Sequence, residues 1–261
     1  MALPNLGTIS SNASTPTIVA IGGGELRERE TLRIDATIVE LAARRRPRAL
    51  FVPTASNDAE GYWETFRSVY GEELGCATDV LWSYDRYESA HDAARRIDAA
   101  DIVYVGGGNT LRMIKRWRRL GIDAMLRVAA ARGAVMSGIS AGAICWFRYG
   151  TSDSRRFYDP TDETLIRVSG LGLVDAVVSP HHVREPHRAA GLREVMRRTS
   201  GVGMALDDGA AIVVRGDRYA LLASLEGAGV SKVYRRGAEV VERRLGQNEQ
   251  EGSLTQLLAR D

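Results

Sequence analysis

The sequence is poor in cysteine, has no excess of either charge and contains no long apolar run, and each shortage excludes a class of protein. Its two cysteines, Cys76 and Cys145, lie in different predicted elements and cannot form a disulfide framework or a metal cluster. The 35 Lys and Arg residues are offset by 33 Asp and Glu residues, which argues against a nucleic-acid partner. No run approaches the roughly 18 apolar residues that span a bilayer. We therefore expect a cytoplasmic protein with no nucleic-acid and no membrane partner.

The amino-terminal segment differs in composition from the rest of the chain. Residues 1–16 are rich in Ser, Thr, Asn and Pro and lack the apolar segment of a signal peptide, so we expect a disordered tail. Residues 17–261 contain no linker with a composition shift, no internal repeat and no low-complexity block. We expect them to form a single α/β domain.

Short apolar runs alternate with amphipathic stretches over the first half of the chain. Strands are expected at residues 17–21, 49–52, 79–82, 101–105 and 134–136, with helices between them. This alternation is typical of a parallel sheet covered by helices on both faces. Beyond it the pattern predicts an irregular segment, a strand, a helix and two hairpins, at residues 155–166, 174–178, 186–199, 210–223 and 230–241.

Three glycine-bearing turns follow the predicted strands, at residues 22–24, 106–108 and 138–142. Ligands of such sheets bind beyond the carboxyl ends of the strands. We therefore expect the functional site where these turns meet.

The third turn contains the candidate nucleophile. Gly138-Ile-Ser-Ala-Gly142 matches the G-x-S-x-G pattern, in which a serine occupies a strained turn between a strand and a helix. Its neighbours must be small so that the helix can approach the strand. The amino terminus of that helix offers N–H groups that can hold an oxyanion. Ser140 is therefore the predicted nucleophile.

A serine nucleophile needs a base, and the chain has four histidines. His181 follows Ser179-Pro180 at the end of a predicted strand and is the expected base. His182 and His187 are expected at the surface or facing substrate, and His91 on an exposed helix. The spacing of the three clustered histidines does not give the i, i+4 pair of a zinc site, so no metal is expected.

The base in turn needs an orienting carboxylate. Asp208 follows the apolar run at residues 202–206, again at a predicted strand end, and is the first candidate. Asp153, thirteen residues after Ser140, is the alternative. An α/β-hydrolase order of Ser, Asp and His would require Asp153.

Five motifs together resemble the dipeptidase E and cyanophycinase family of serine peptidases. They occur in that family's order, over about residues 17–236: Gly22-Gly-Gly-Glu25, Gly106-Gly-Gly-Asn-Thr110, Gly138-Ile-Ser-Ala-Gly-Ala143, Ser179-Pro-His181 and Ala205-Leu-Asp-Asp-Gly209. The resemblance implies a class I glutamine amidotransferase-like fold, a three-layer α/β sandwich whose mostly parallel central sheet is flanked by helices. It also implies that Ser140 is the nucleophile, that His181 is the base, and that the N–H groups of Gly108 and Ala141 form the oxyanion hole. The family's dipeptidase has a glutamate where this chain has Asp208, so Asp153 stays open.

The resemblance also implies a substrate class. The family's dipeptidase cleaves aspartyl dipeptides and its cyanophycinases release β-aspartyl-arginine, so we expect a small peptide substrate and no cofactor. Asn109, Arg184 and Arg188 are the candidate substrate-binding residues, the arginines because a substrate carboxylate needs a cation. An amidotransferase-like thiol enzyme and a non-catalytic binding module are the alternatives, although Cys145 is expected in the core. Pairing of two copies through a sheet edge, giving a homodimer, is left open.

Overall fold

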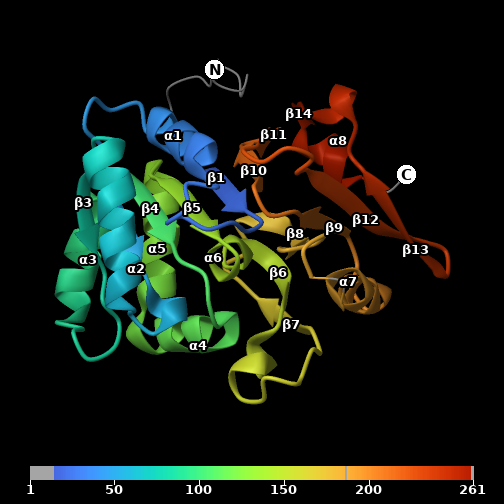
Figure 1. Ribbon diagram of the computed structural model, residues 1–261, viewed down its shortest axis with the longest axis horizontal. Helices are drawn as coiled ribbons and strands as arrows, with labels where there is room; N and C mark the ends of the chain where they lie inside the picture. Colours follow the sequence, from blue (N-terminus) through green and yellow to red (C-terminus); the bar gives the residue numbers. More distant parts are fainter. Residues whose placement is uncertain (1–14, 186, 260–261) are drawn as a thin grey trace.

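The alternation of strands and helices produces a central sheet in the computed structural model, which describes residues 15–185 and 187–259 (Figure 1). The predicted disordered tail lies outside the described residues except for positions 15 and 16. In the first half of the chain the elements are β1 (Thr17–Ile21), α1 (Leu32–Leu41), β2 (Arg48–Val52), η1 (Thr54–Ser56), α2 (Glu60–Phe66), η2 (Arg67–Glu73), β3 (Ala77–Val80), α3 (Ala90–Ala99), β4 (Ile102–Val105), α4 (Thr110–Leu120), α5 (Ile122–Arg132) and β5 (Val135–Ile139).

The second half contains fewer α-helices and more strands. Its elements are α6 (Ala141–Ile144), β6 (Phe147–Ser152), η3 (Ser154–Phe157), β7 (Ile166–Ser169), β8 (Val174–Ser179), α7 (His187–Arg197), β9 (Val202–Leu206), β10 (Ala210–Arg215), β11 (Arg218–Ala223), β12 (Val230–Arg236), β13 (Glu239–Arg244), η4 (Gln247–Glu249), β14 (Glu251–Ser253) and α8 (Leu254–Leu258). None of the helices in the described part of the chain is both long and apolar enough to cross a membrane.

The central sheet has eight strands in the order β14-β11-β10-β1-β5-β4-β2-β3. Strands β1, β5, β4, β2 and β3 run parallel, whereas β10, β11 and β14 are antiparallel to their neighbours. The parallel strands β1, β4 and β5 therefore end at one edge, and the three glycine turns follow them there. These five parallel strands are the ones that the sequence predicts.

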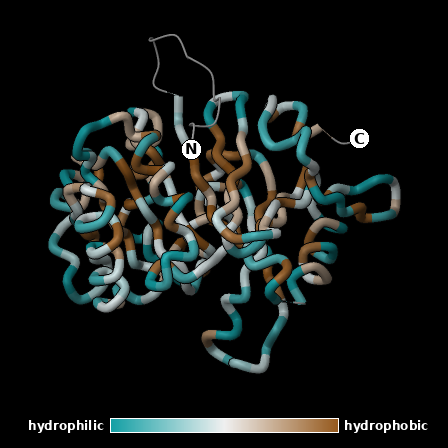
Figure 2. The backbone as a smooth tube through the Cα atoms, turned by 45° about the horizontal axis from the view of Figure 1, so that its top comes forward, coloured by the Kyte–Doolittle hydropathy of each residue, from teal (hydrophilic) through white to brown (hydrophobic). Residues whose placement is uncertain are grey.

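Apolar side chains on both faces of the parallel strands bury the sheet on both sides, as a parallel sheet requires. Ile18 and Ala20 point into one core with α3, α4 and α5, while Val19 and Ile21 point into the other with α1 and α2. Figure 2 shows the hydrophobic strands in the interior and mostly hydrophilic segments outside. The predicted α/β sandwich with helices on both faces is confirmed.

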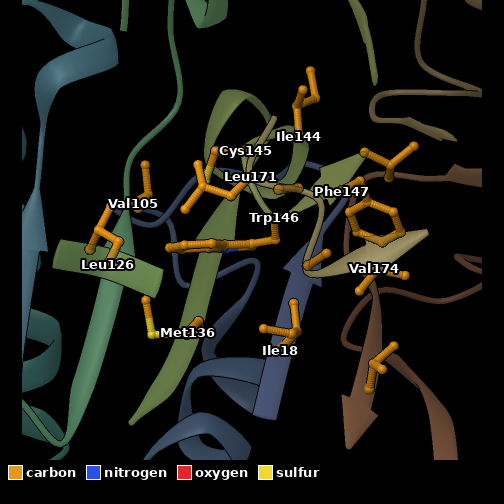
Figure 3. Close-up of a cluster of buried hydrophobic side chains, with 14 of the residues drawn as sticks. Ile18, Val105, Leu126, Met136, Ile144, Cys145, Trp146, Phe147, Leu171 and Val174 are labelled. Atoms are coloured by element: carbon orange, nitrogen blue, oxygen red, sulfur yellow. The ribbon is translucent and has the colours of Figure 1, made fainter. Parts of the chain in front are cut away.

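A second sheet of six strands, in the order β13-β12-β9-β8-β6-β7, was not anticipated. It shares the larger hydrophobic core with the central sheet, and α7 covers its other face. Trp146 is fully buried in that shared core, and Figure 3 shows its indole among Val105, Met136 and Leu126. Helix α6 spans only four residues, so β6 begins shortly after the elbow. This strand could therefore not be recognised from the sequence.

Several other boundaries differ from the sequence prediction. Strand β3 begins and ends two residues earlier than expected, and β5 extends to Ile139. Strands β6, β7 and β14 and the short helix α8 were not predicted. The two predicted hairpins exist, but β10–β11 joins the central sheet and β12–β13 the second sheet.

Asp35 is a fully buried carboxyl group in the core between the central sheet and helices α1 and α2. Asp35 of α1 accepts hydrogen bonds from the hydroxyls of Thr31 and Tyr70, both at 2.8 Å. Burial raises its pKa to about 7, although the two hydrogen bonds favour the ionised form. Between pH 3.8 and about 7, Asp35 therefore carries a proton in the folded protein, whereas in the unfolded chain it is ionised.

We predict that Asp35→Asn becomes more stable relative to the wild type as pH rises. The stability that Asp35 contributes is complete below pH 3.8 and is lost as pH rises through about 7. The difference in unfolding free energy between the two proteins should therefore grow by on the order of 1.4 kcal/mol per pH unit across that interval. Urea unfolding at several pH values measures it, with exposed Asp98→Asn as the control. An unchanging difference would contradict the burial argument.

Candidate active site

The elbow after β5 places Ser140 in the conformation that a G-x-S-x-G turn requires. Its φ and ψ are 56° and −111°, and α6 begins at the next residue. A Cβ at Gly142 would collide with the carbonyl oxygen of Val105, and one at Gly138 would lie 2.6 Å from the carbonyl oxygen of Gly142. The two glycines therefore permit the close crossing of helix and strand that exposes the serine.

His181 reaches Ser140 from the second sheet. It follows β8 and Pro180 and has a φ of 55°. Its Nε2 lies 2.9 Å from Oγ of Ser140, and its Nδ1 lies 2.6 Å from Oδ1 of Asp208. Because an ionised carboxylate only accepts, the Nδ1 proton is donated to Asp208 and Nε2 is free to accept the Ser140 proton. The three side chains form one hydrogen-bonded chain.

Asp208, which follows β9, is held on both of its carboxylate oxygens. Oδ1 contacts His181, and Oδ2 accepts a hydrogen bond from Arg184 at 2.9 Å. Burial disfavours the ionised form, but the hydrogen bonds from His181 and Arg184 outweigh it and hold the pKa of Asp208 below its ordinary value. Asp208 is therefore ionised at neutral pH.

Backbone carbonyl groups at the end of β1 hold the three segments together. The carbonyl of Ile21 accepts the N–H of Ser140 at 3.1 Å, and that of Gly22 accepts the N–H of His181 at 3.2 Å. The carbonyl of Gly23 accepts the N–H of Gly209 at 2.9 Å. Ile21 and the first two residues of the Gly22–Gly24 turn thus set the relative positions of all three segments.

The alternative carboxylate, Asp153, lies elsewhere. It forms an ion pair with Arg188 at 3.2 Å, and Arg188 also contacts Glu185 at 2.6 Å. The side chain of Arg188 is only 2% exposed, so two carboxylates already neutralise a buried guanidinium. The prediction of Arg188 as a substrate-binding residue is therefore corrected: it pairs within the protein. Of the two candidate carboxylates, Asp208 is the one in contact with His181.

The other two candidate substrate-binding residues also have partners within the protein. Arg184 is 59% exposed and donates to Asp208. Asn109 is fully buried, and its Oδ1 accepts the N–H of Arg112 at the start of α4. The Asn109 side chain caps a helix, because strand β4 passes directly through the glycine turn into α4.

A cleft of about 650 Å³ opens beside Ser140 and His181. Its walls are the loop after β1 and the first turns of α2. The residues that line it are Gly24, Glu25, Leu26, Arg27, Glu28, Gly61, Tyr62, Thr65, Gly107, Ile139, Ser140 and His181. Of the described residues in the second glycine turn, Gly107 lines the cleft and the predicted oxyanion donor Gly108 does not. Nothing in the sequence motifs pointed to α2 as a wall of the site.

The remaining histidines and the cysteine lie outside the hydrogen-bonded chain. His182 is buried with Nε2 2.6 Å from Glu242, and His187 lies 3.5 Å from Glu185. Within residues 15–185 and 187–259 no group of three His, Cys, Asp or Glu side chains could hold a metal ion. Cys145 is fully buried and burial raises the pKa of its thiol well above the ordinary value, which disfavours the thiol alternative.

Comparison with known proteins gives one consistent assignment. The model of peptidase family S51 matches residues 18–222. The uncharacterized peptidase YgaJ of Bacillus subtilis is 33% identical over 228 residues, covering 86% of this chain and 95% of that protein. Peptidase E of Streptomyces coelicolor is 30% identical, covering 76% of this chain and 79% of that protein.

Two solved structures share the fold. A peptidase from an acI-B1 actinobacterium superposes with a TM-score of 0.66 at 17% identity, covering 92% of this chain and 97% of the other. A peptidase E protein from Listeria monocytogenes gives a TM-score of 0.59 at 20% identity, covering 89% and 100%. At these identities the likeness concerns the fold alone, which is class I glutamine amidotransferase-like as expected.

We predict that Gly23→Ala lowers the reactivity of Ser140 without unfolding the protein. The new methyl group would occupy the space of Oδ1 of Asp208 and the ring of His181, which are side-chain atoms that can move. A displacement of about 1 Å can cost about 10²-fold in rate, so labelling of Ser140 by a fluorophosphonate should slow at least that much. Gly61→Ala, whose methyl group would have no neighbour within 4 Å, is the control for stability. Labelling of Gly23→Ala at the wild-type rate would contradict the prediction.

Proposed function

The chain belongs to peptidase family S51 and is a serine-type peptidase, and from that premise we propose that it hydrolyses aspartyl dipeptides through Ser140, His181 and Asp208. The observation that carries the proposal is the hydrogen-bonded chain of these three side chains at the edge of a cleft. A nucleophile, a base within 2.9 Å and an orienting carboxylate are the parts that acyl transfer needs.

The proposed reaction has two steps. Ser140 Oγ attacks the peptide carbonyl carbon while its proton passes to Nε2 of His181. The C–N bond then breaks, the imidazolium gives its proton to the leaving amine, and an acyl-enzyme remains. Water attacks the ester with His181 again as base, and Ser140 is regenerated. Asp208 stays ionised throughout and stabilises the imidazolium.

Stabilisation of the oxyanion is assigned by resemblance to the N–H groups of Gly108 and Ala141. Ala141 is the first residue of α6, where backbone N–H groups have no partner within the helix. A positive φ of 132° at Gly108 and its contact with the backbone of Ala55 explain why that position is glycine. Each such donor contributes about 10²–10³-fold to the rate in serine peptidases.

The cleft suits a small peptide with a free carboxylate. Its volume of about 650 Å³ lies within the roughly 300–1,000 Å³ of typical small-molecule sites. Arg27 lines it, and within the described residues its guanidinium forms no ion pair. Since Arg184 and Arg188 already pair with carboxylates of the protein, Arg27 is the arginine that supports binding of an aspartyl side chain.

A β-aspartyl-arginine peptide is the alternative substrate. Glu25 and Glu28 also line the cleft, and within the described residues neither carboxylate has an ion-pair partner. Two such carboxylates favour a substrate that carries a guanidinium or an ammonium group. The α-aspartyl and β-aspartyl substrates share the same nucleophile and differ in the position of the scissile carbonyl.

We predict that the wild type cleaves dipeptides with amino-terminal aspartate and that Ser140→Ala reduces this cleavage by about 10⁴-fold or more, because no nucleophile remains. Product release from Asp-X, Asn-X, Ala-X and β-Asp-Arg measures both the activity and the preference. Cleavage of β-Asp-Arg alone would replace the α-aspartyl assignment with the alternative. Equal inactivity of both proteins on the whole panel would contradict the proposed function.

We also predict that Asp208→Asn and Asp153→Asn differ in effect. Asp208→Asn should lower kcat by about 10³–10⁴-fold, because an amide no longer fixes the productive tautomer of His181. Asp153→Asn should lower the Tm, since it removes one partner of the buried Arg188, and should leave kcat within a few-fold of the wild type. Dipeptide hydrolysis and thermal unfolding measure the two effects. The reverse ranking of kcat would make Asp153 the orienting carboxylate.

A further inference from the structure

Tyr62 brings a hydroxyl group into the cleft from an element that none of the sequence motifs covers. It lies in the first turns of α2, on the wall that faces the loop after β1. Its ring packs edge-on against Phe51, with centroids 4.9 Å apart, and a Cβ at Gly106 would lie 2.8 Å from it. The ring is therefore fixed by packing, and the position of its hydroxyl is fixed with it.

The hydroxyl lies on the turn that supports the nucleophile. It accepts the N–H of Gly107 at 3.4 Å. Gly107 in turn lies against Ser140, since a Cβ built on it would be 3.4 Å from Cβ and 3.9 Å from Oγ of the serine. Gly107, Tyr62 and Ser140 all line the same cleft. In space, only Gly107 lies between the hydroxyl of Tyr62 and Ser140 in this chain of contacts.

The phenol retains a proton to donate. It uses a lone pair to accept from Gly107, which leaves its own O–H available to a substrate in the cleft. Burial raises the pKa of Tyr62 to about 12, so the group stays protonated wherever His181 is neutral. An N–H donor behind the hydroxyl also polarises it and strengthens the hydrogen bond that it donates.

We propose that Tyr62 is a further catalytic residue whose hydroxyl donates a hydrogen bond to the oxyanion formed when Ser140 attacks its substrate. The inference rests on the proposed role of Ser140 but not on the identity of the peptide. It gives the oxyanion hole a side-chain donor from α2 in addition to backbone donors from the elbow and the glycine turn. The Gly107 N–H supports that donor from behind.

The test compares Tyr62→Phe with Tyr104→Phe. Phenylalanine keeps the ring packing at both positions. Tyr104 belongs to the same aromatic cluster, and its buried hydroxyl has no hydrogen-bond partner within the described residues. We expect Tyr62→Phe to lower kcat for dipeptide hydrolysis about 10–100-fold with little change in KM, and Tyr104→Phe to match the wild type. The Tm of both variants should stay close to that of the wild type.

A fluorophosphonate probe tests the donor separately from the choice of peptide. Ser140 attacks phosphorus, the P–F bond breaks, fluoride leaves and His181 takes the proton, so the phosphoryl oxygen occupies the oxyanion position. Tyr62→Phe should be labelled about 10–100-fold more slowly than the wild type. With the P=S analogue, whose sulfur accepts hydrogen bonds weakly, the two proteins should differ by less than about 3-fold. A merely structural defect would slow both probes equally.

The outcomes separate the two proposals. Labelling of Tyr62→Phe at the wild-type rate, or equal slowing with both probes, would overturn the role of Tyr62. A wild type that reacts with the probe but cleaves no aspartyl dipeptide would overturn the proposed substrate and leave the role of Tyr62 to be decided by the labelling rates. A wild type that is not labelled at Ser140 would overturn both.

Discussion

Three consecutive carbonyl groups at the end of β1, those of residues 21–23, are the constraint on which the site depends. Each accepts one backbone N–H, from Ser140, His181 and Gly209 in turn. These donors come from segments that are up to 69 residues apart in the chain, and a side chain at the second or third position would collide with them. The arrangement is therefore set by the backbone, which is stiffer than any network of side chains. Strand β1 lies between β5 and β10, near the centre of the sheet, so its end is within reach of all three segments.

Two of the arginines near the site form ion pairs with carboxylates of the protein itself, and this determines which charges are left to face the cleft. Arg188 is buried between Asp153 and Glu185, and Arg184 neutralises the outer oxygen of Asp208. Removing either carboxylate would leave the charge of this buried guanidinium less compensated, which is destabilising. Glu25, Arg27 and Glu28, which have no ion-pair partner among the described residues, lie on the loop after β1 and form part of one wall of the cleft. The charged side chains that could select a substrate thus lie on the loop, whereas Ser140, His181 and Asp208 directly follow strands or lie one residue beyond them.

The sequence predicted the elements of the first half, and it singled out Ser140, His181 and Asp208, which the structure brings together, because both leave local signals. A β-branched run, a glycine turn and a residue directly after a strand can be recognised without knowing what packs around them. The second sheet was only partly recognisable: strands β8 and β9 and the β12–β13 hairpin were expected, but β6 follows a four-residue helix and β7 begins where the segment predicted to be irregular ends. Burial and pairing are also invisible in the sequence. Asn109 and Arg188 were therefore assigned to substrate, while Tyr62 and Arg27, on the cleft wall, were overlooked.

The site lies at the seam between the two sheets, and this has a consequence for the order in which the chain becomes competent. Ser140, the proposed nucleophile, and the three glycine turns follow strands of the central sheet and lie within the first 145 residues, whereas His181 and Asp208 follow strands of the second sheet. A nascent chain that has emerged only as far as α6 holds a serine with no base. In the proposed function Ser140 therefore gains its base and its orienting carboxylate only when the carboxyl-terminal half has folded against the first. The packing of the two sheets on each other, which buries Trp146 in their shared core, is thus also what brings Ser140, His181 and Asp208 together.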